Sequence, residues 1–97
     1  MMAVKIFIKR QIKKDSLNDA PAMLIQARKN AMAKPGYIST ETLVNYDDPC
    51  QVVVVSMWQK KEDWDAYVRS SEREENEKQF GSILDADTQY EIFRMGM

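Results

Sequence analysis

Residues 36–73 read GYISTETLVNYDDPCQVVVVSMWQKKEDWDAYVRSSER and set the architecture of this chain. Two β-like runs, 37–46 and 51–59, meet at the turn signal Asp-Asp-Pro, and a helix predicted over 60–70 follows at once. The second run holds four consecutive valines and is apolar on both faces. Strands of this kind are covered on two sides, so we expect helices of the chain to cover one face and a partner subunit the other.

The flanking sequence supplies two further strands and two further helices. Residues 3–12 alternate as a strand, and an amphipathic helix follows, with its N-cap at Asp15-Ser16 or at Asp19, until Pro35-Gly36 ends it. A helix beginning at Ser71, in a capping-box pattern, leads to a last strand over 88–95. The order predicts one α+β domain over residues 1–97, a ferredoxin-like βαββαβ plait with a four-stranded antiparallel sheet.

Length and composition bound the class of protein. A chain of 97 residues makes one domain with a thin margin of stability, which dimerisation would supplement. With Cys50 as the sole cysteine, we expect no disulfide within the chain, as suits a reducing compartment. We also expect neither a signal peptide nor a membrane span, and hence a cytoplasmic protein without membrane contact.

The charges are unevenly distributed although the net charge is −1. Residues 1–34 carry eight Lys/Arg and two acids, whereas residues 35–97 carry six and thirteen. The basic run at 9–14 suggests nucleic acid, but it contains no aromatic residue and no RNA-binding or helix-turn-helix signature accompanies it. We interpret it as a solvated strand end that helps to attract an anionic small molecule, and expect no nucleic-acid partner.

Several short motifs together resemble the antibiotic biosynthesis monooxygenase (ABM) domain. They are Pro35-Gly36-Tyr37, Glu41-Thr42-Leu43, Tyr46-Asp47-Asp48-Pro49, Met57-Trp58, Trp64, Tyr67 and Arg73. The resemblance covers nearly the whole chain and implies a homodimer that forms a dimeric α/β barrel. As a marker of function it is less specific, because the family includes quinone-forming monooxygenases, haem-degrading enzymes and proteins without a known activity.

The resemblance implies a cofactor-independent monooxygenase that acts on a small aromatic or quinol substrate. Such an enzyme needs an apolar pocket, a hydrogen-bond partner for the substrate and exclusion of water. The alternative is a non-catalytic dimeric module that binds a small hydrophobic ligand or serves in stress response. Haem degradation is disfavoured because the chain has no histidine, and neither His nor paired Cys is present to form a transition-metal site.

Seven residues are candidates for the site that the resemblance implies. Tyr67 and Glu41 are the catalytic candidates, and the substrate-binding candidates are Asn45, Tyr46, Trp58, Trp64 and Arg73. Each has an alternative structural role. The tryptophans and Tyr67 are also typical core residues, Glu41 could form a salt bridge, and the Asn-Tyr pair could stabilise the hairpin.

Overall fold

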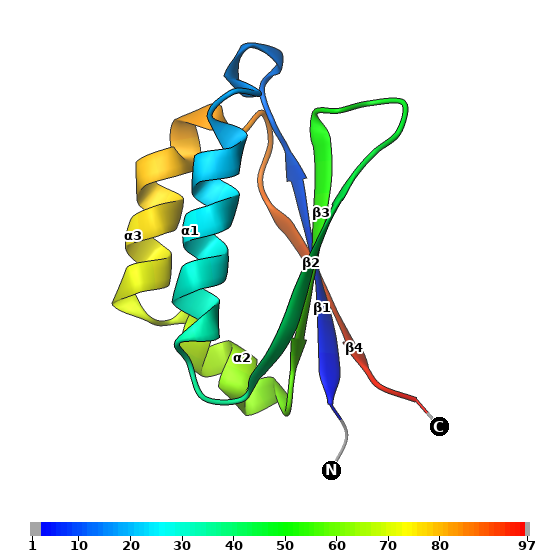
Figure 1. Ribbon diagram of the computed structural model, residues 1–97, viewed down its shortest axis with the longest axis vertical. Coiled ribbons are helices and arrows are strands. Elements are labelled where there is room, and N and C mark those ends of the chain that lie inside the picture. The colour runs from blue at the N-terminus through cyan, green and yellow to red at the C-terminus, as the bar shows by residue number, and fades with distance from the viewer. Residues whose placement is uncertain (1–2, 97) are drawn as a thin grey trace.

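The computed structural model describes residues 3–96 as a four-stranded antiparallel sheet with helices on one face (Figure 1). The strands lie in the order β2-β3-β1-β4, and the α+β plait expected from the sequence is confirmed. They are β1 (Val4–Gln11), β2 (Tyr37–Val44), β3 (Gln51–Trp58) and β4 (Gln89–Arg94). The helices are α1 (Ala20–Met32), α2 (Lys61–Val68) and α3 (Ser71–Phe80), with short 3-10 turns η1 (Lys14–Ser16) and η2 (Gly81–Ile83).

Alternation along β1 separates a helix-facing side from an open side. Every second residue is buried beneath the helices, and the intervening ones are half-buried on the opposite face. The helix-facing residues are Val4, Ile6, Ile8 and Arg10. A charged residue therefore lies in a row of aliphatic ones, and the interpretation of residues 9–14 as a solvated strand end is wrong for Arg10.

The β2 strand contains an irregularity that alters the predicted faces. Strict alternation places Tyr37 on the same side as Ser39 and Glu41, but the register with β3 shifts between Tyr37 and Ser39. Tyr37 consequently lies opposite Trp58, and its hydroxyl lies 2.7 Å from Oγ1 of Thr40. The extra residue at this bulge brings Tyr37 to the helix side and leaves Glu41 on the open side.

The open face of the sheet carries an apolar strip that the described chain does not cover. Phe7 and Phe93 pack edge to face, with ring centroids 5.4 Å apart. Phe93 and Leu43 remain 51% and 46% exposed. Val53 and Met57 of β3 lie half-buried in the same strip, whereas Val55 between them is buried. An exposed strip of this kind is a candidate interaction surface, as the valine run predicts.

Local signals at the helix ends are partly as predicted. Pro21 lies in the first turn of α1, where its missing N–H costs no hydrogen bond. The N-cap of α3 is Ser70, not Ser71, and its hydroxyl accepts a hydrogen bond from the backbone N–H of Arg73 at 3.3 Å. Between residues 3 and 96, no helix combines the length and apolarity that crossing a membrane requires.

Candidate functional site

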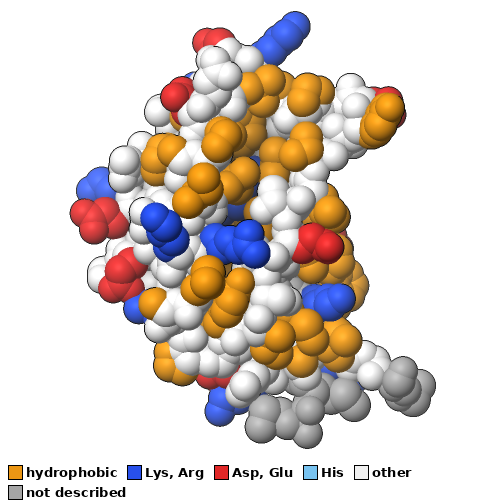
Figure 2. Space-filling view, viewed as in Figure 1, with side chains coloured by type: hydrophobic (Ala, Val, Ile, Leu, Met, Phe, Trp, Pro, Cys, Tyr) orange, Lys and Arg blue, Asp and Glu red, His pale blue; other side chains and the backbone are white. Residues whose placement is uncertain are grey.

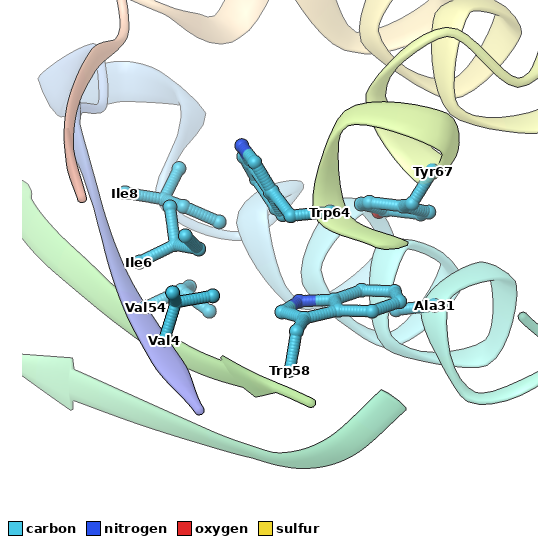
Figure 3. Close-up of a cluster of buried hydrophobic side chains, with 8 residues drawn as sticks. All are labelled: Val4, Ile6, Ile8, Ala31, Val54, Trp58, Trp64 and Tyr67. Atoms are coloured by element: carbon cyan, nitrogen blue, oxygen red, sulfur yellow. The ribbon is translucent and has the colours of Figure 1, made fainter. Parts of the chain in front are cut away.

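An aromatic cluster joins α2 to the sheet (Figure 3). The Trp58 ring stacks on the Tyr67 ring with centroids 5.2 Å apart, and Trp64 meets Trp58 edge to face at 6.2 Å. Trp58 has no exposed surface, and its indole N–H donates to Oγ of Ser56 at 2.8 Å. Both tryptophans are core residues in this structure, and their contact with substrate stays a prediction.

Tyr67 places a hydroxyl group at the edge of this cluster. The hydroxyl donates to the backbone carbonyl of Ala27 on α1 at 3.3 Å. Burial raises the pKa of Tyr67 above its ordinary value of 10.0, and the nearby positive charges of Arg73 and Arg10 oppose this effect. Tyr67 is therefore a neutral phenol near pH 7, able to donate a hydrogen bond.

A polar network lies beside Tyr67, between β1, α3 and β4. Nη2 of Arg10 lies 2.9 Å from Oε1 of Glu77, and Nη2 of Arg73 lies 3.3 Å from the same oxygen. Arg73 also donates to the hydroxyl of Tyr90, and its guanidinium carbon lies 5.7 Å from the centre of that ring. Burial raises the pKa of Tyr90, with Arg73 again acting in the opposite direction. Two arginines thus share one carboxylate.

A narrow cavity of about 30 Å³, here named the α1–sheet crevice, reaches Tyr67 from the gap between α1 and the sheet. Figure 2 shows a basic group at this gap, over the side of α1 that faces the sheet. Its polar lining consists of Arg10, Arg28, Thr40, Thr42, Ser56 and Tyr67. Its apolar lining consists of Ile8, Leu24, Ala27, Ala31 and Val54. Apolar walls with a few convergent polar groups are typical of small-molecule sites.

A second, wider hollow of about 480 Å³, here named the α3–β4 groove, lies on the other side of the network. It is lined by Arg73, Glu77, Gly81, Leu84, Asp85, Ala86, Asp87, Thr88 and Tyr90. Three of these side chains are carboxylates, and only one is cationic. Arg10 lines the crevice and Glu77 lines the groove, so this ion pair lies between the two hollows.

The structure brings together only part of the predicted site. Tyr67 lies beside the network that contains Arg73, close enough for the Arg73 charge to oppose the rise in the Tyr67 pKa. Glu41 lies elsewhere, because it pairs with Val55 on the open face and is exposed. Within one chain Glu41 and Tyr67 therefore share no cavity: Glu41 lies on the open face of the sheet, whereas Tyr67 of α2 lies on the helix side.

The predicted substrate-binding pair Asn45 and Tyr46 lies in the β2–β3 hairpin. Oδ1 of Asn45 accepts the backbone N–H groups of Asp47 and Asp48 at 2.8 and 3.0 Å, and Tyr46 is 99% exposed. These contacts form an Asx-type turn, so Asn45 has the structural role that was the alternative. Neither residue lines the crevice or the groove.

Sequence reasoning missed three members of the network: Arg10, Glu77 and Tyr90. The alternation of Val4, Ile6 and Ile8 already places Arg10 on the buried face, so the strand pattern contained the signal. Glu77 is one of several acids on α3, and no sequence feature distinguishes it.

Over residues 3–96, no group of three or more His, Cys, Asp or Glu side chains is arranged to hold a metal ion.

Solved structures of other proteins have the same architecture. A protein of Methanosarcina mazei Go1 superimposes with a TM-score of 0.90 at 19% identity, covering 99% of this chain and 95% of its own. A protein of Nitrosomonas europaea, assigned to the antibiotic biosynthesis monooxygenases, gives 0.89 at 13% identity and covers 96% and 89%. A variant of SnoaB, a cofactor-independent oxygenase from Streptomyces nogalater, gives 0.84 at 9% identity and covers 94% and 90%.

These likenesses show the fold, because their identities are low. A search of the curated proteins finds no match. The family model for antibiotic biosynthesis monooxygenase, by contrast, matches residues 2–84, most of the sequence. The chain belongs to the antibiotic biosynthesis monooxygenase family.

Proposed function

We propose that this protein is a cofactor-independent monooxygenase that acts on a small aromatic or quinol compound in the α1–sheet crevice. The observation that carries the proposal is the position of Tyr67, a neutral hydroxyl donor at a crevice between α1 and the sheet, in a chain of this family. The structural likeness to the SnoaB variant, a cofactor-independent oxygenase, supports the same reaction class.

The proposed reaction needs no external reductant. A phenol with a free para carbon and one O₂ give a quinone and one water, so the substrate supplies all the electrons. The chain would hold the substrate oxygen in the crevice by a hydrogen bond from Tyr67, exclude water from it, and pack the ring at the mouth of the crevice against Leu24 and Ala27. In this structure the Tyr67 hydroxyl donates to the Ala27 carbonyl, so the substrate oxygen would replace that carbonyl as its acceptor.

We further propose that the working unit is a homodimer formed through the open face. Its apolar strip, with Phe93 and Leu43 about half exposed, supports this assembly. A sheet-to-sheet contact would leave the helix side, and hence the crevice, free in each subunit. We propose a cytoplasmic location on the sequence arguments alone.

Oxygen uptake tests the proposed activity. Wild-type protein is assayed with a panel of phenols and hydroquinones against their autoxidation, beside Tyr67→Phe and the matched variant Tyr37→Phe. Tyr37 is a second partly buried tyrosine that packs on Trp58 and does not line the crevice. We expect Tyr67→Phe to lower the rate and Tyr37→Phe to retain it. Equal rates for all three proteins would overturn the role of Tyr67.

A second function is favoured by one observation, the filling of the core. Trp58 and Trp64 occupy the space between α2 and the sheet, and the crevice is small. A non-catalytic dimeric module that binds a small hydrophobic ligand, or serves in stress response, would need no larger site. Saturable binding of a panel compound without oxygen uptake would favour this alternative.

A further inference from the structure

The buried Arg10 is incompletely partnered. Its side chain is 5% exposed, and the Nε atom has no hydrogen-bond partner within residues 3–96. Among the described residues its one ion pair is with Glu77, whose Oε1 atom is also 3.3 Å from Arg73. Two guanidinium groups and one carboxylate leave a net positive charge; the Arg73 and Glu77 side chains are 19% and 20% exposed, but Arg10 is buried. An uncompensated charge in such a place is costly, so a negatively charged partner would be strongly favoured.

The α1–sheet crevice is the space in which this partner fits. None of its lining residues is acidic, and Arg28 adds a second positive charge on α1. Hydroxyl groups of Thr40, Ser56 and Tyr67 supply hydrogen-bond donors. The α3–β4 groove is unsuitable for an anion, because Glu77 and two aspartates line it. A third hollow of about 240 Å³, at the C-terminal end of β1, also touches Arg10 and is lined by Lys9 and Asp87.

We propose that Arg10 forms an anion-binding subsite that takes the ionised oxygen of an aromatic phenol. A volume of about 30 Å³ holds one water-sized oxygen and not a ring. The oxygen would therefore bind at Arg10, and the ring would lie toward Leu24, Ala27 and the rim at Arg28. This inference rests on the proposed function in that it names the substrate class of the same site, a phenolate.

A chromogenic phenol tests the inference without any turnover. 4-Nitrophenol is colourless when neutral and yellow when ionised, so absorbance reports which form is bound. We expect wild-type protein to prefer the phenolate and to lower the pKa of the bound probe by about one unit, a tenfold preference, as a nearby opposite charge does. Arg10→Gln should abolish the shift. An unshifted pKa on the wild type, or an unchanged shift in Arg10→Gln, would overturn the proposal.

Two further variants guard against a merely structural effect. Glu77→Gln removes the shared carboxylate, so we expect it to increase the preference for phenolate at least severalfold, opposite in sign to Arg10→Gln. If the Glu77→Gln protein is folded by circular dichroism but has lost its preference for phenolate, the subsite is contradicted. This test still applies if Arg10→Gln fails to fold. Arg69→Gln, at the exposed C-terminal end of α2, is the matched control and should leave the shift unchanged.

The two proposals fail in distinguishable ways. A phenolate preference that depends on Arg10, without oxygen uptake on any phenol, would confirm the subsite and overturn the monooxygenase activity. Oxygen uptake with a rate unaffected by Arg10→Gln, and no shift of the nitrophenol pKa, would overturn the subsite and leave the activity standing. 4-Nitrobenzyl alcohol, which stays neutral, should bind more weakly than the phenolate; equal binding would also overturn the subsite.

Discussion

Nη2 of Arg10, on β1, lies 2.9 Å from Oε1 of Glu77, which is 67 residues further along the chain on α3. The pair connects the central part of the sheet to the outer helix. Because Arg10 is buried, its charge depends on that carboxylate for compensation.

The Arg10–Glu77 pair should be strongly coupled in stability. Removing the carboxylate with Glu77→Gln should lower the free energy of unfolding by about 3 kcal/mol, because it leaves a buried cation unpaired. The double variant Arg10→Met/Glu77→Gln should lose less stability than the sum of the two single variants, because it no longer contains an unpaired buried charge. Urea denaturation of the four proteins checks this; additive effects would show that the two side chains are not coupled.

The buried tyrosines should make stability fall at high pH. Burial raises the folded-state pKa of Tyr67 and Tyr90 above the ordinary value of 10.0. Above pH 10 the unfolded chain therefore holds fewer protons on these groups than the folded one, and the free energy of unfolding decreases as the pH rises. Denaturation at a series of pH values should show this decline in the wild type. The double variant Tyr67→Phe/Tyr90→Phe should show a shallower decline, and an unchanged slope would contradict the assignment.

Trp58 should matter for stability. It has no exposed surface, and its ring contacts three other aromatic rings. Trp58→Ala should cost about 4 kcal/mol, a large part of the 5–15 kcal/mol that typical domains possess. Tyr46→Ala, in the exposed hairpin, should change stability by less than about 0.5 kcal/mol. Equal denaturation midpoints for the two variants would refute the core role of Trp58.

The open face should determine the oligomeric state. We expect the wild type to sediment as a dimer at micromolar concentration and Leu43→Lys/Phe93→Glu to sediment as a folded monomer, because both side chains are exposed in the single chain. Ile25→Lys, on an exposed position of α1, is the matched control and should remain dimeric. A compact, stable wild-type monomer would contradict the proposed assembly.

The sequence predicts the plait well because its signals are local. The valine run, the Asp-Asp-Pro turn and the aliphatic alternation of β1 each specify one element, and the antiparallel order follows from their succession. The amphipathic helix expected before Pro35 is also present as α1, with Ala20, Met23 and Ala31 buried. The short 3-10 turns lack such periodic signals and were not predicted.

The candidate site depends on which face of the sheet each side chain occupies, and one inserted residue changes that face. The β-bulge between Tyr37 and Ser39 places Tyr37 on the helix side, whereas the alternation of the strand places Glu41 on the open side. The same parity places Arg10 beneath the helices, although its charge suggests solvent. The Arg10–Glu77 contact spans most of the chain, so no local pattern could reveal it.

The most direct test of the account is oxygen consumption by purified protein with a panel of phenols and hydroquinones, followed together with quinone formation. The account predicts consumption above autoxidation for at least one compound, with one O₂ used per quinone formed from a phenol. It also predicts a decrease of about tenfold or more in Tyr67→Phe, the size expected for a lost hydrogen bond to a charged oxygen. Consumption no faster than without protein for every compound, by a correctly folded dimer, would contradict it.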